Sequence, residues 1–107
     1  MEPATSREER FWDIADEMLH AGLAEEGTMM AHRCLRARGA FFASAGRHGG
    51  ELIVKLPEQR VRELIDAGTG EEFAPAGRTF REWVVVVDDD PALWRALMHE
   101  ARQFVSP

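Results

Sequence analysis

The sequence predicts an α+β domain of two layers, in which helices cover an antiparallel sheet of five strands in the order α-β-β-β-α-β-β-α. Helical stripes occupy both ends of the chain, and short apolar segments separated by glycine turns lie between them. The clearest strand is Trp83 followed by four valines, because an apolar run bounded by charge needs cover on at least one face. The 107 residues suit a single domain, with flexible ends expected at residues 1–5 and 106–107.

The first helix is predicted at residues 7–24. Ser6 and Glu9 have the spacing of a capping box, and apolar side chains then recur at helical intervals. The apolar pattern then shortens, which indicates strands joined by glycine turns of hairpin length at residues 37–39 and 46–50. We therefore expect an antiparallel meander of three strands, at residues 28–36, 40–45 and 51–56.

The second half of the chain should contain two more helices. Pro57 at a first helical position and Gly68 just past the last turn bound a short helix. A brief strand is expected at residues 72–74. The last helix should begin where Asp90 can cap it, because Pro91 suits its first position.

The valine strand, at residues 81–87, should lie inside the sheet. Side chains alternate along a strand, so one face should carry Trp83, Val85 and Val87 and the other Val84 and Val86. Both sets are apolar, which predicts burial on both sides.

The net charge of −6 is unevenly distributed, with −6 over residues 1–27, +3 over residues 28–81 and −3 over residues 82–107. The negative total disfavours non-specific binding to polyanions, while a local anion site stays open. The one cysteine cannot form an intrachain disulfide, and the sequence contains no leader or membrane-spanning run. We therefore expect a cytoplasmic protein without membrane attachment.

Several scaffold residues resemble those of a known family. They are residues 39–43, residues 52–56, Phe73 ahead of a Gly-Arg turn, and residues 81–84. Together they resemble TfoX N-terminal domain-like proteins, which are similar in turn to the MmcQ/YjbR group. The resemblance covers residues 11–105 and implies the fold just derived, in a small bacterial module that binds partners and catalyses no reaction.

The same resemblance implies an association with competence regulation and, through the YjbR-like relatives, with DNA binding. Full-length TfoX proteins carry a second, helical domain, and this sequence ends at Pro107 without one. A role as a competence regulator is therefore not expected. The domain shape and a binding function are what the resemblance carries over.

Seven basic residues of the middle segment form the candidate site for an anion or a partner. Lys55, Arg78 and Arg81 stand where the resemblance has bases, and folding could bring their strand ends together as an anion-binding patch. The alternative is that they are solvated charges that discourage edge pairing. The other four candidates are Arg33, Arg36, Arg38 and Arg47.

Those four arginines suggest a second hypothesis, a nucleic-acid surface. Arg36 and Arg38 share a strand face that Arg33 does not. Such a surface also needs exposed aromatic rings for stacking. The only aromatic residues nearby are Phe41, Phe42 and Phe80. The first two suit the core or an interface better, so the binding-module hypothesis stays ahead of nucleic acid.

The residues that could support catalysis or metal binding form no convincing set. His32 and Cys34 share a strand face, as a thiolate–imidazole pair would, but a buried thiol is the simpler interpretation. The run Asp88-Asp89-Asp90 lacks the glycine and the terminal glutamate of a calcium loop and suits a helix start. The sequence therefore predicts no enzyme, no cofactor and no metal site.

A second copy of the chain is the partner that the apolar pattern favours. The strands have apolar residues at successive positions, which point to opposite faces of the sheet, as in Phe41 beside Phe42 and Val84 beside Val85. The first and last helices can both cover the same side of the sheet, which would leave the other side partly bare. Monomers seldom leave large apolar patches wet, so we expect a homodimer. The alternative is that one helix crosses to the second face, and a different protein partner also stays open.

Overall fold

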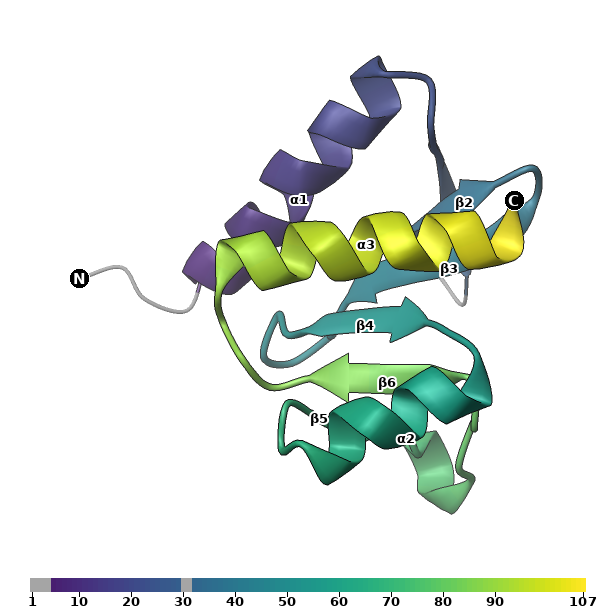
Figure 1. The fold of residues 1–107 in the computed structure, drawn as a ribbon. Coiled ribbons are helices and arrows are strands. Elements are labelled where there is room, and N and C mark those ends of the chain that lie inside the picture. The colour runs from purple at the N-terminus through teal and green to yellow at the C-terminus, as the bar shows by residue number, and fades with distance from the viewer. Residues whose placement is uncertain (1–4, 30–31) are drawn as a thin grey trace.

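The computed structural model describes residues 5–29 and 32–107. The flexibility expected at residues 1–5 falls almost wholly outside these ranges. Helices at the two ends of the chain enclose hairpins and one short central helix (Figure 1). The elements in chain order are α1 (Thr5–His20), β1 (Glu25–Met29), β2 (His32–Ala37), β3 (Ala40–Ala45), β4 (Leu52–Lys55), α2 (Glu58–Asp66), β5 (Gly70–Glu72), η1 (Pro75–Gly77), β6 (Trp83–Val86) and α3 (Pro91–Val105).

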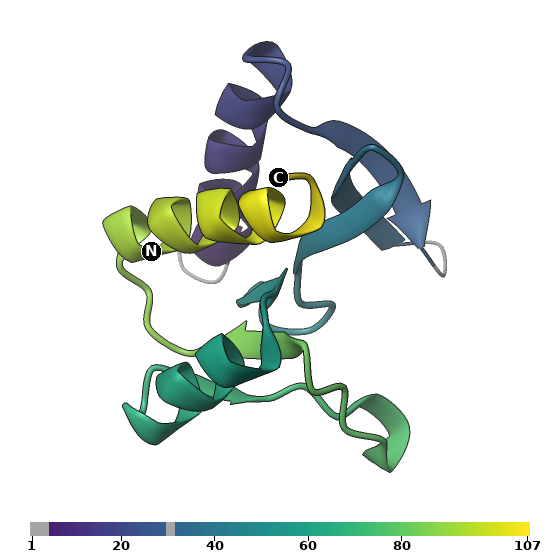
Figure 2. The same ribbon diagram turned by 45° about the vertical axis from the view of Figure 1, so that its right-hand side comes forward.

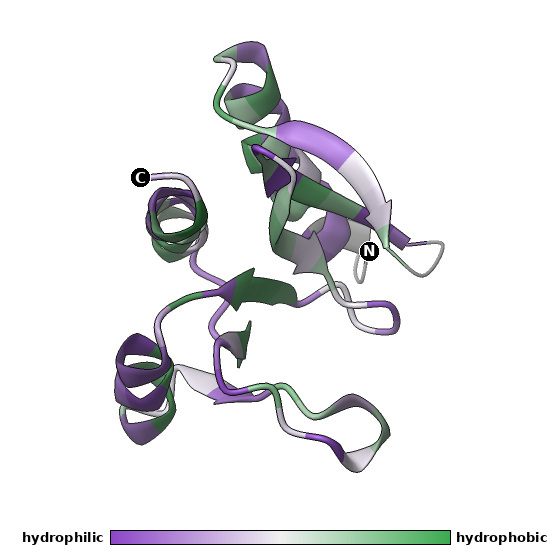
Figure 3. Ribbon diagram, turned by 90° about the vertical axis from the view of Figure 1, so that its right-hand side faces the viewer, coloured by the Kyte–Doolittle hydropathy of each residue, from purple (hydrophilic) through white to green (hydrophobic). Residues whose placement is uncertain are grey.

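The strands form one antiparallel sheet in the order β1-β2-β3-β4-β6-β5, and the described chain is an α+β fold as predicted. β6 lies between β4 and β5, because the chain passes through α2 and makes edge strand β5 before it returns. All three helices pack their apolar stripes on one face of this sheet. Seen from the side, α2 and α3 lie on one side of the strands and the segment 73–80 extends on the other (Figure 3). No helix of the described ranges has the length and apolarity that crossing a bilayer requires.

The prediction of five strands is wrong by one. Residues 28–36, expected as a single strand, belong to a hairpin in which β1 pairs antiparallel with β2, Glu26 opposite Leu35 and Met29 opposite His32. Strand β1 ends at Met29, and strand β2 begins at His32 and runs in the opposite direction. Residues 28–36 contain no glycine, proline, asparagine or aspartate, so the sequence has no turn signal that would divide this segment into two strands.

The valine strand alternates as predicted and lies inside the sheet. Val84 and Val86 are fully buried under the helices. On the other face Trp83 and Val85 are half-buried and Val87 is 40% exposed. Burial on both sides is therefore not reached among the residues that the structure describes, because none of their helices crosses to the second face.

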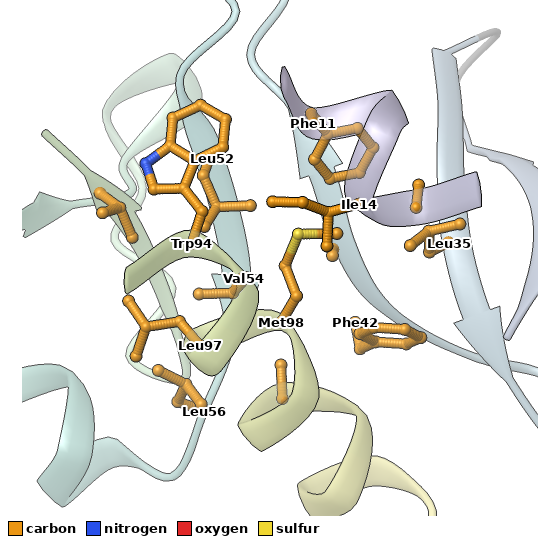
Figure 4. Packing of buried hydrophobic residues seen from close by; sticks show 14 of the residues in the cluster. Phe11, Ile14, Leu35, Phe42, Leu52, Val54, Leu56, Trp94, Leu97 and Met98 are labelled. Carbon is orange, nitrogen blue, oxygen red and sulfur yellow. The ribbon is translucent and has the colours of Figure 1, made fainter. Parts of the chain in front are cut away.

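One cluster of apolar side chains fills the space between sheet and helices (Figure 4). Phe11 and Ile14 of α1 approach Met98 of α3 over the strands, and Phe42 closes the cluster from β3. Burying one large apolar side chain of this kind stabilises the fold by roughly 1.5–3 kcal/mol. Phe42 therefore belongs to the core, as expected, and is not free to stack on a ligand.

The predicted end of α2 and the predicted start of α3 are correct, whereas Pro57 lies at the N-cap of α2 and not at its first helical position. Asp90 Oδ1 accepts a hydrogen bond from Ala92 N (3.1 Å), and Pro91 occupies the first turn of α3. Gly68 (φ 79°) follows α2 in the left-handed region, where glycine is unstrained. Helix α1 begins at Thr5, so Ser6 lies within the helix and not ahead of it as predicted.

Candidate binding surface

The face of the sheet without helices, which we call the helix-free face, is the candidate binding surface. Ile53 of β4 pairs in register with Val85 of β6, and Ser44 and Glu71 continue the same row across β3 and β5. We call these four residues the central row. Ile53 is buried and Val85 half-buried, whereas Glu71 at the sheet edge is exposed.

Two further rows flank the central row on the same face. At one end Lys55 pairs with Trp83, and Lys55 Nζ lies 5.9 Å from the centre of the Trp83 ring. At the other end, Glu51 directly precedes β4 and Val87 directly follows β6. The alternation of side chains along a strand places both on this same face. The Glu51 carboxylate lies against Gly46, where a Cβ would come within 2.5 Å of Glu51 Oε1. The face is thus apolar at its centre, with a base and an acid at opposite ends of β4.

The segment between β5 and β6 adds aromatic rings at the Lys55 end. The ring of Phe73 lies 5.9 Å from that of Phe80 and 6.3 Å from that of Trp83, measured between centres. A hydrogen bond from Phe80 N to Phe73 O (3.0 Å) closes the segment, and Gly77 (φ 80°) turns its tip. We call residues 73–80 the aromatic loop. It lies at the opposite end of the molecule from α1 (Figures 1 and 2).

The aromatic loop also presents positive charge. The Arg78 guanidinium lies 5.4 Å from the centre of the Phe80 ring, and Phe80 is 37% exposed. Cation–π contacts at such exposed sites contribute about 0.5–1 kcal/mol each. Ring and charge are therefore available together to a partner at this end of the face.

The sheet topology brings five of the seven predicted bases to one end, where β2 and β4 finish and β3 and β6 begin. Acids accompany several of them. Lys55 Nζ lies 3.7 Å from Glu82, and Arg81 lies 3.9 Å from Glu58. Such exposed pairs are weak, but they reduce the local positive charge. The five bases are Arg36, Arg38, Lys55, Arg78 and Arg81.

Arg36 and Arg38 belong to the β2–β3 hairpin. Arg36 Nε lies 3.2 Å from the Glu25 carboxylate, close enough for an ion pair, although Arg36 Nε makes no hydrogen bond to any described residue. Arg38 (φ 53°) and Gly39 (φ 84°) form the two-residue turn, and positive φ at both positions is typical of a type I′ hairpin. The turn was predicted from its glycine.

Arg33 and Arg47 lie apart from the other five. The Arg33 guanidinium is 4.0 Å from the centre of the Trp12 ring of α1, and its Nε donates to Glu26 at 2.5 Å. That hydrogen bond lowers the pKa of Glu26 and raises the pKa of Arg33. Arg47 lies in the β3–β4 turn, at the far end of the sheet. The four arginines considered for nucleic acid are thus divided between two faces and two ends.

The His32 and Cys34 side chains make separate hydrogen bonds to main-chain oxygens. His32 Nε2 is 2.6 Å from Ala45 O, so this nitrogen donates to a carbonyl. The Cys34 thiol donates to the main-chain oxygen of His32 (3.4 Å) and not to the imidazole. Cys34 is 2% exposed, and burial raises the pKa of its thiol, which favours the unreactive neutral form.

The aspartate run serves the start of α3. Asp88 Oδ1 accepts from Asp90 N (2.9 Å), and Asp89 pairs with Arg7 of α1 at 3.0 Å. Among the described residues no group of three or more histidine, cysteine or acidic side chains could hold a metal ion.

A cavity of about 300 Å³ lies between α2 and the end of the aromatic loop. Its lining mixes three acids, including Glu58, with two arginines, Arg62 and Arg81. Arg62 and Arg81 each lie just under 4 Å from Glu58, at 3.8 and 3.9 Å. The mixed lining presents no single sign of charge to a ligand, so this cavity is weaker as a site than the helix-free face.

Sequence reasoning missed Glu51 and the ring cluster as parts of the surface. The signal for the rings is that Trp83 has the parity opposite to the buried Val84, so its ring must lie on the face away from the helices. Glu51 points to the same face of the sheet as Lys55, because the two are an even number of residues apart. This relation indicates a binding surface only once that face is known to lack helices. Comparison of the chain with family models, curated proteins and solved structures found no match.

Proposed function

We propose that this chain is a non-enzymatic binding module that works through its helix-free face, and that its first partner is a second copy of itself. The observation that carries the proposal is the group of partly covered apolar side chains on β6 at this face, Trp83, Val85 and Val87, beside the buried Ile53 of β4. A two-fold contact is the commonest way for a soluble domain to cover such a patch.

The resemblance to TfoX N-terminal domain-like proteins supports the same proposal, because it implies a cytoplasmic module that binds. The geometry of His32 and Cys34 also supports a role without catalysis, since the thiol and the imidazole make separate hydrogen bonds to main-chain oxygens. No substrate chemistry is needed to account for either side chain.

Nucleic-acid binding is the second candidate, and the aromatic loop is the observation that favours it. Phe80 beside Arg78 has the combination of ring and cation on which bases stack. Against it stand the net charge of −6 and the acids paired with Lys55 and Arg81. Long-range repulsion of phosphate therefore favours the protein partner.

Light scattering coupled to size exclusion tests the first candidate. The wild-type protein should have the mass of two chains at micromolar concentration, and Val85→Arg should reduce it to one. The matched control is Ala96→Arg, which puts the same side chain on the exposed side of α3 and should leave the dimer intact. A wild-type mass of one chain that does not rise on concentration would contradict the proposal, as would a dimer unaffected by Val85→Arg.

A further inference from the structure

We infer that two copies pack their helix-free faces about a two-fold axis that runs across the strands, along the central row, so that Lys55 of each copy meets Glu51 of the other. This inference rests on the proposed function and adds to it the orientation of the two copies. It follows from the register of β4 and β6 and from the charges at the two ends of β4.

Two identical sheets that pack face to face can be related by an axis across the strands or by an axis along them. An axis across the strands keeps each strand opposite its own copy and reverses its direction. Residues equally distant from the axis on either side then face one another. With the axis along the central row, Lys55 and Glu51 are both two residues from Ile53 on β4.

The same axis matches apolar side chains on the neighbouring strand. Trp83 and Val87 are both two residues from Val85, so Trp83 of one copy faces Val87 of the other. Val87, at 40%, is among the large apolar side chains that a single chain leaves exposed. The contact thus covers Val87 with an indole ring, and Ile53 and Val85 meet their own copies at the centre.

An axis along the strands gives a poorer match. It would exchange β4 with β6, so that Glu51 faced Val87 and Lys55 faced Trp83 of the second copy. A carboxylate against an apolar side chain loses its hydration without gaining a partner, which is costly. Charge complementarity therefore selects the axis across the strands.

Both members of the proposed pair are poorly satisfied in one chain. Glu51 Oε1 is buried and accepts no hydrogen bond from any described residue. The contact between Lys55 and Glu82 is long, at 3.7 Å, and Glu82 is about half exposed. Because the β3–β4 turn encloses Glu51 Oε1, the ammonium of a second copy would approach the other carboxylate oxygen of Glu51, and Lys55 would gain a carboxylate inside the interface.

Charge reversal tests the orientation. Lys55→Glu alone and Glu51→Lys alone should each raise the dimer dissociation constant at least roughly tenfold, because each creates two like-charged contacts per dimer. The double variant Lys55→Glu with Glu51→Lys should return the constant to near the wild-type value, since both pairs are then restored in reverse. Arg62→Glu, an exposed reversal on α2, is the control and should change little.

The outcomes separate the orientation from the proposed function. If Val85→Arg dissociates the dimer but the double reversal stays as weak as the single ones, the helix-free face is the interface and the orientation is wrong. If the wild-type protein is a monomer, both fail. Should a reversed variant fold poorly by circular dichroism, Lys55→Met and Glu51→Gln replace it. Their effects on the dissociation constant should then be non-additive, and additive effects would overturn the inference.

Discussion

The indole Nε1 of Trp94 donates a hydrogen bond to the main-chain oxygen of Asp88, at 2.6 Å. Trp94 is fully buried, and Asp88 belongs to the short connection between β6 and α3. The bond therefore ties the core face of α3 to the end of the valine strand. It also gives a donor to a carbonyl in a segment where the Asp88 and Asp90 carboxylates accept main-chain N–H groups at the start of α3.

Replacing Trp94 by Phe should lower the free energy of unfolding by about 1–3 kcal/mol. The substitution leaves the Asp88 oxygen without its donor and removes ring atoms from a close-packed site. Urea unfolding followed by circular dichroism measures the change. Trp12→Phe is the control, because the Trp12 indole is half-buried and donates no hydrogen bond to any residue that the structure describes. An equal loss in both variants would argue against the role of the hydrogen bond.

Gly70 should tolerate no side chain, although alanine usually improves a strand. Gly70 is buried in β5 opposite Val86, and a Cβ there would lie 2.6 Å from Val84 Cγ2 and 3.4 Å from Leu64 Cβ. We expect Gly70→Ala to destabilise the protein by about 1–3 kcal/mol through overpacking. Glu72→Ala, on the same strand but exposed, should change stability little in the same urea titration. A Gly70→Ala protein as stable as wild type would show that α2 can shift to make room.

The parts of the fold that follow from local chemistry could be predicted, and those that depend on register could not. Asp90 before Pro91 defines a helix start, and the alternation from Trp83 to Val87 defines a strand, because each depends on neighbouring residues alone. Strand β1 was missed because its sequence, Glu-Glu-Gly-Thr-Met, has no apolar alternation and is held mainly by pairing with β2.

The candidate surface was predictable to the same extent. A helix-free apolar face was expected, and the helices do lie on one side. The contribution of Glu51 was not expected, because its position relative to Lys55 matters only when the helix-free face of a second copy packs against that of the first. The separation of Arg33 from Arg36 followed from strand parity, whereas the contact of Arg33 with Trp12 depends on where α1 packs.

Stability should fall at alkaline pH because of Cys34. Burial raises the pKa of its thiol in the folded state, so above the ordinary thiol pKa the unfolded chain binds fewer protons than the folded one. The stabilising contribution is present below the unfolded-state pKa and is lost as pH rises through the folded-state pKa. The free energy of unfolding should therefore decrease more steeply in wild type than in Cys34→Ala from about pH 8.5 upward. Parallel curves for the two proteins would contradict this account.

Sequence-specific DNA binding is expected to be absent at physiological salt. The net charge of −6 repels phosphate, and the arginines occupy different faces and ends of the sheet. Fluorescence anisotropy with labelled duplexes should detect at most weak association at low salt that disappears as salt increases. A tight, saturable complex with one duplex, abolished by Arg36→Ala together with Arg38→Ala, would contradict the prediction.

Glu71 offers a test of the two-fold axis that uses a single neutralising substitution. Glu71 continues the central row at the exposed edge of the sheet, so an axis along this row brings Glu71 of one copy toward Glu71 of the other. Like charges that face one another across an interface weaken it. Glu71→Gln should therefore tighten the dimer, by an amount on the order of 0.2–1 kcal/mol.

The effect of Glu71→Gln should shrink as salt is added, because the charges are exposed and screening acts within about 10 Å at 0.1 M ionic strength. Glu72→Gln is the matched control, since Glu72 pairs with Val84 and so lies on the opposite face of the same strand. Sedimentation equilibrium of the three proteins at two salt concentrations measures the dissociation constants. With the axis along the strands, Glu71 of one copy would not face Glu71 of the other, and the substitution would leave the dissociation constant unchanged. Equal dissociation constants for Glu71→Gln and wild type at low salt would therefore exclude the axis across the strands.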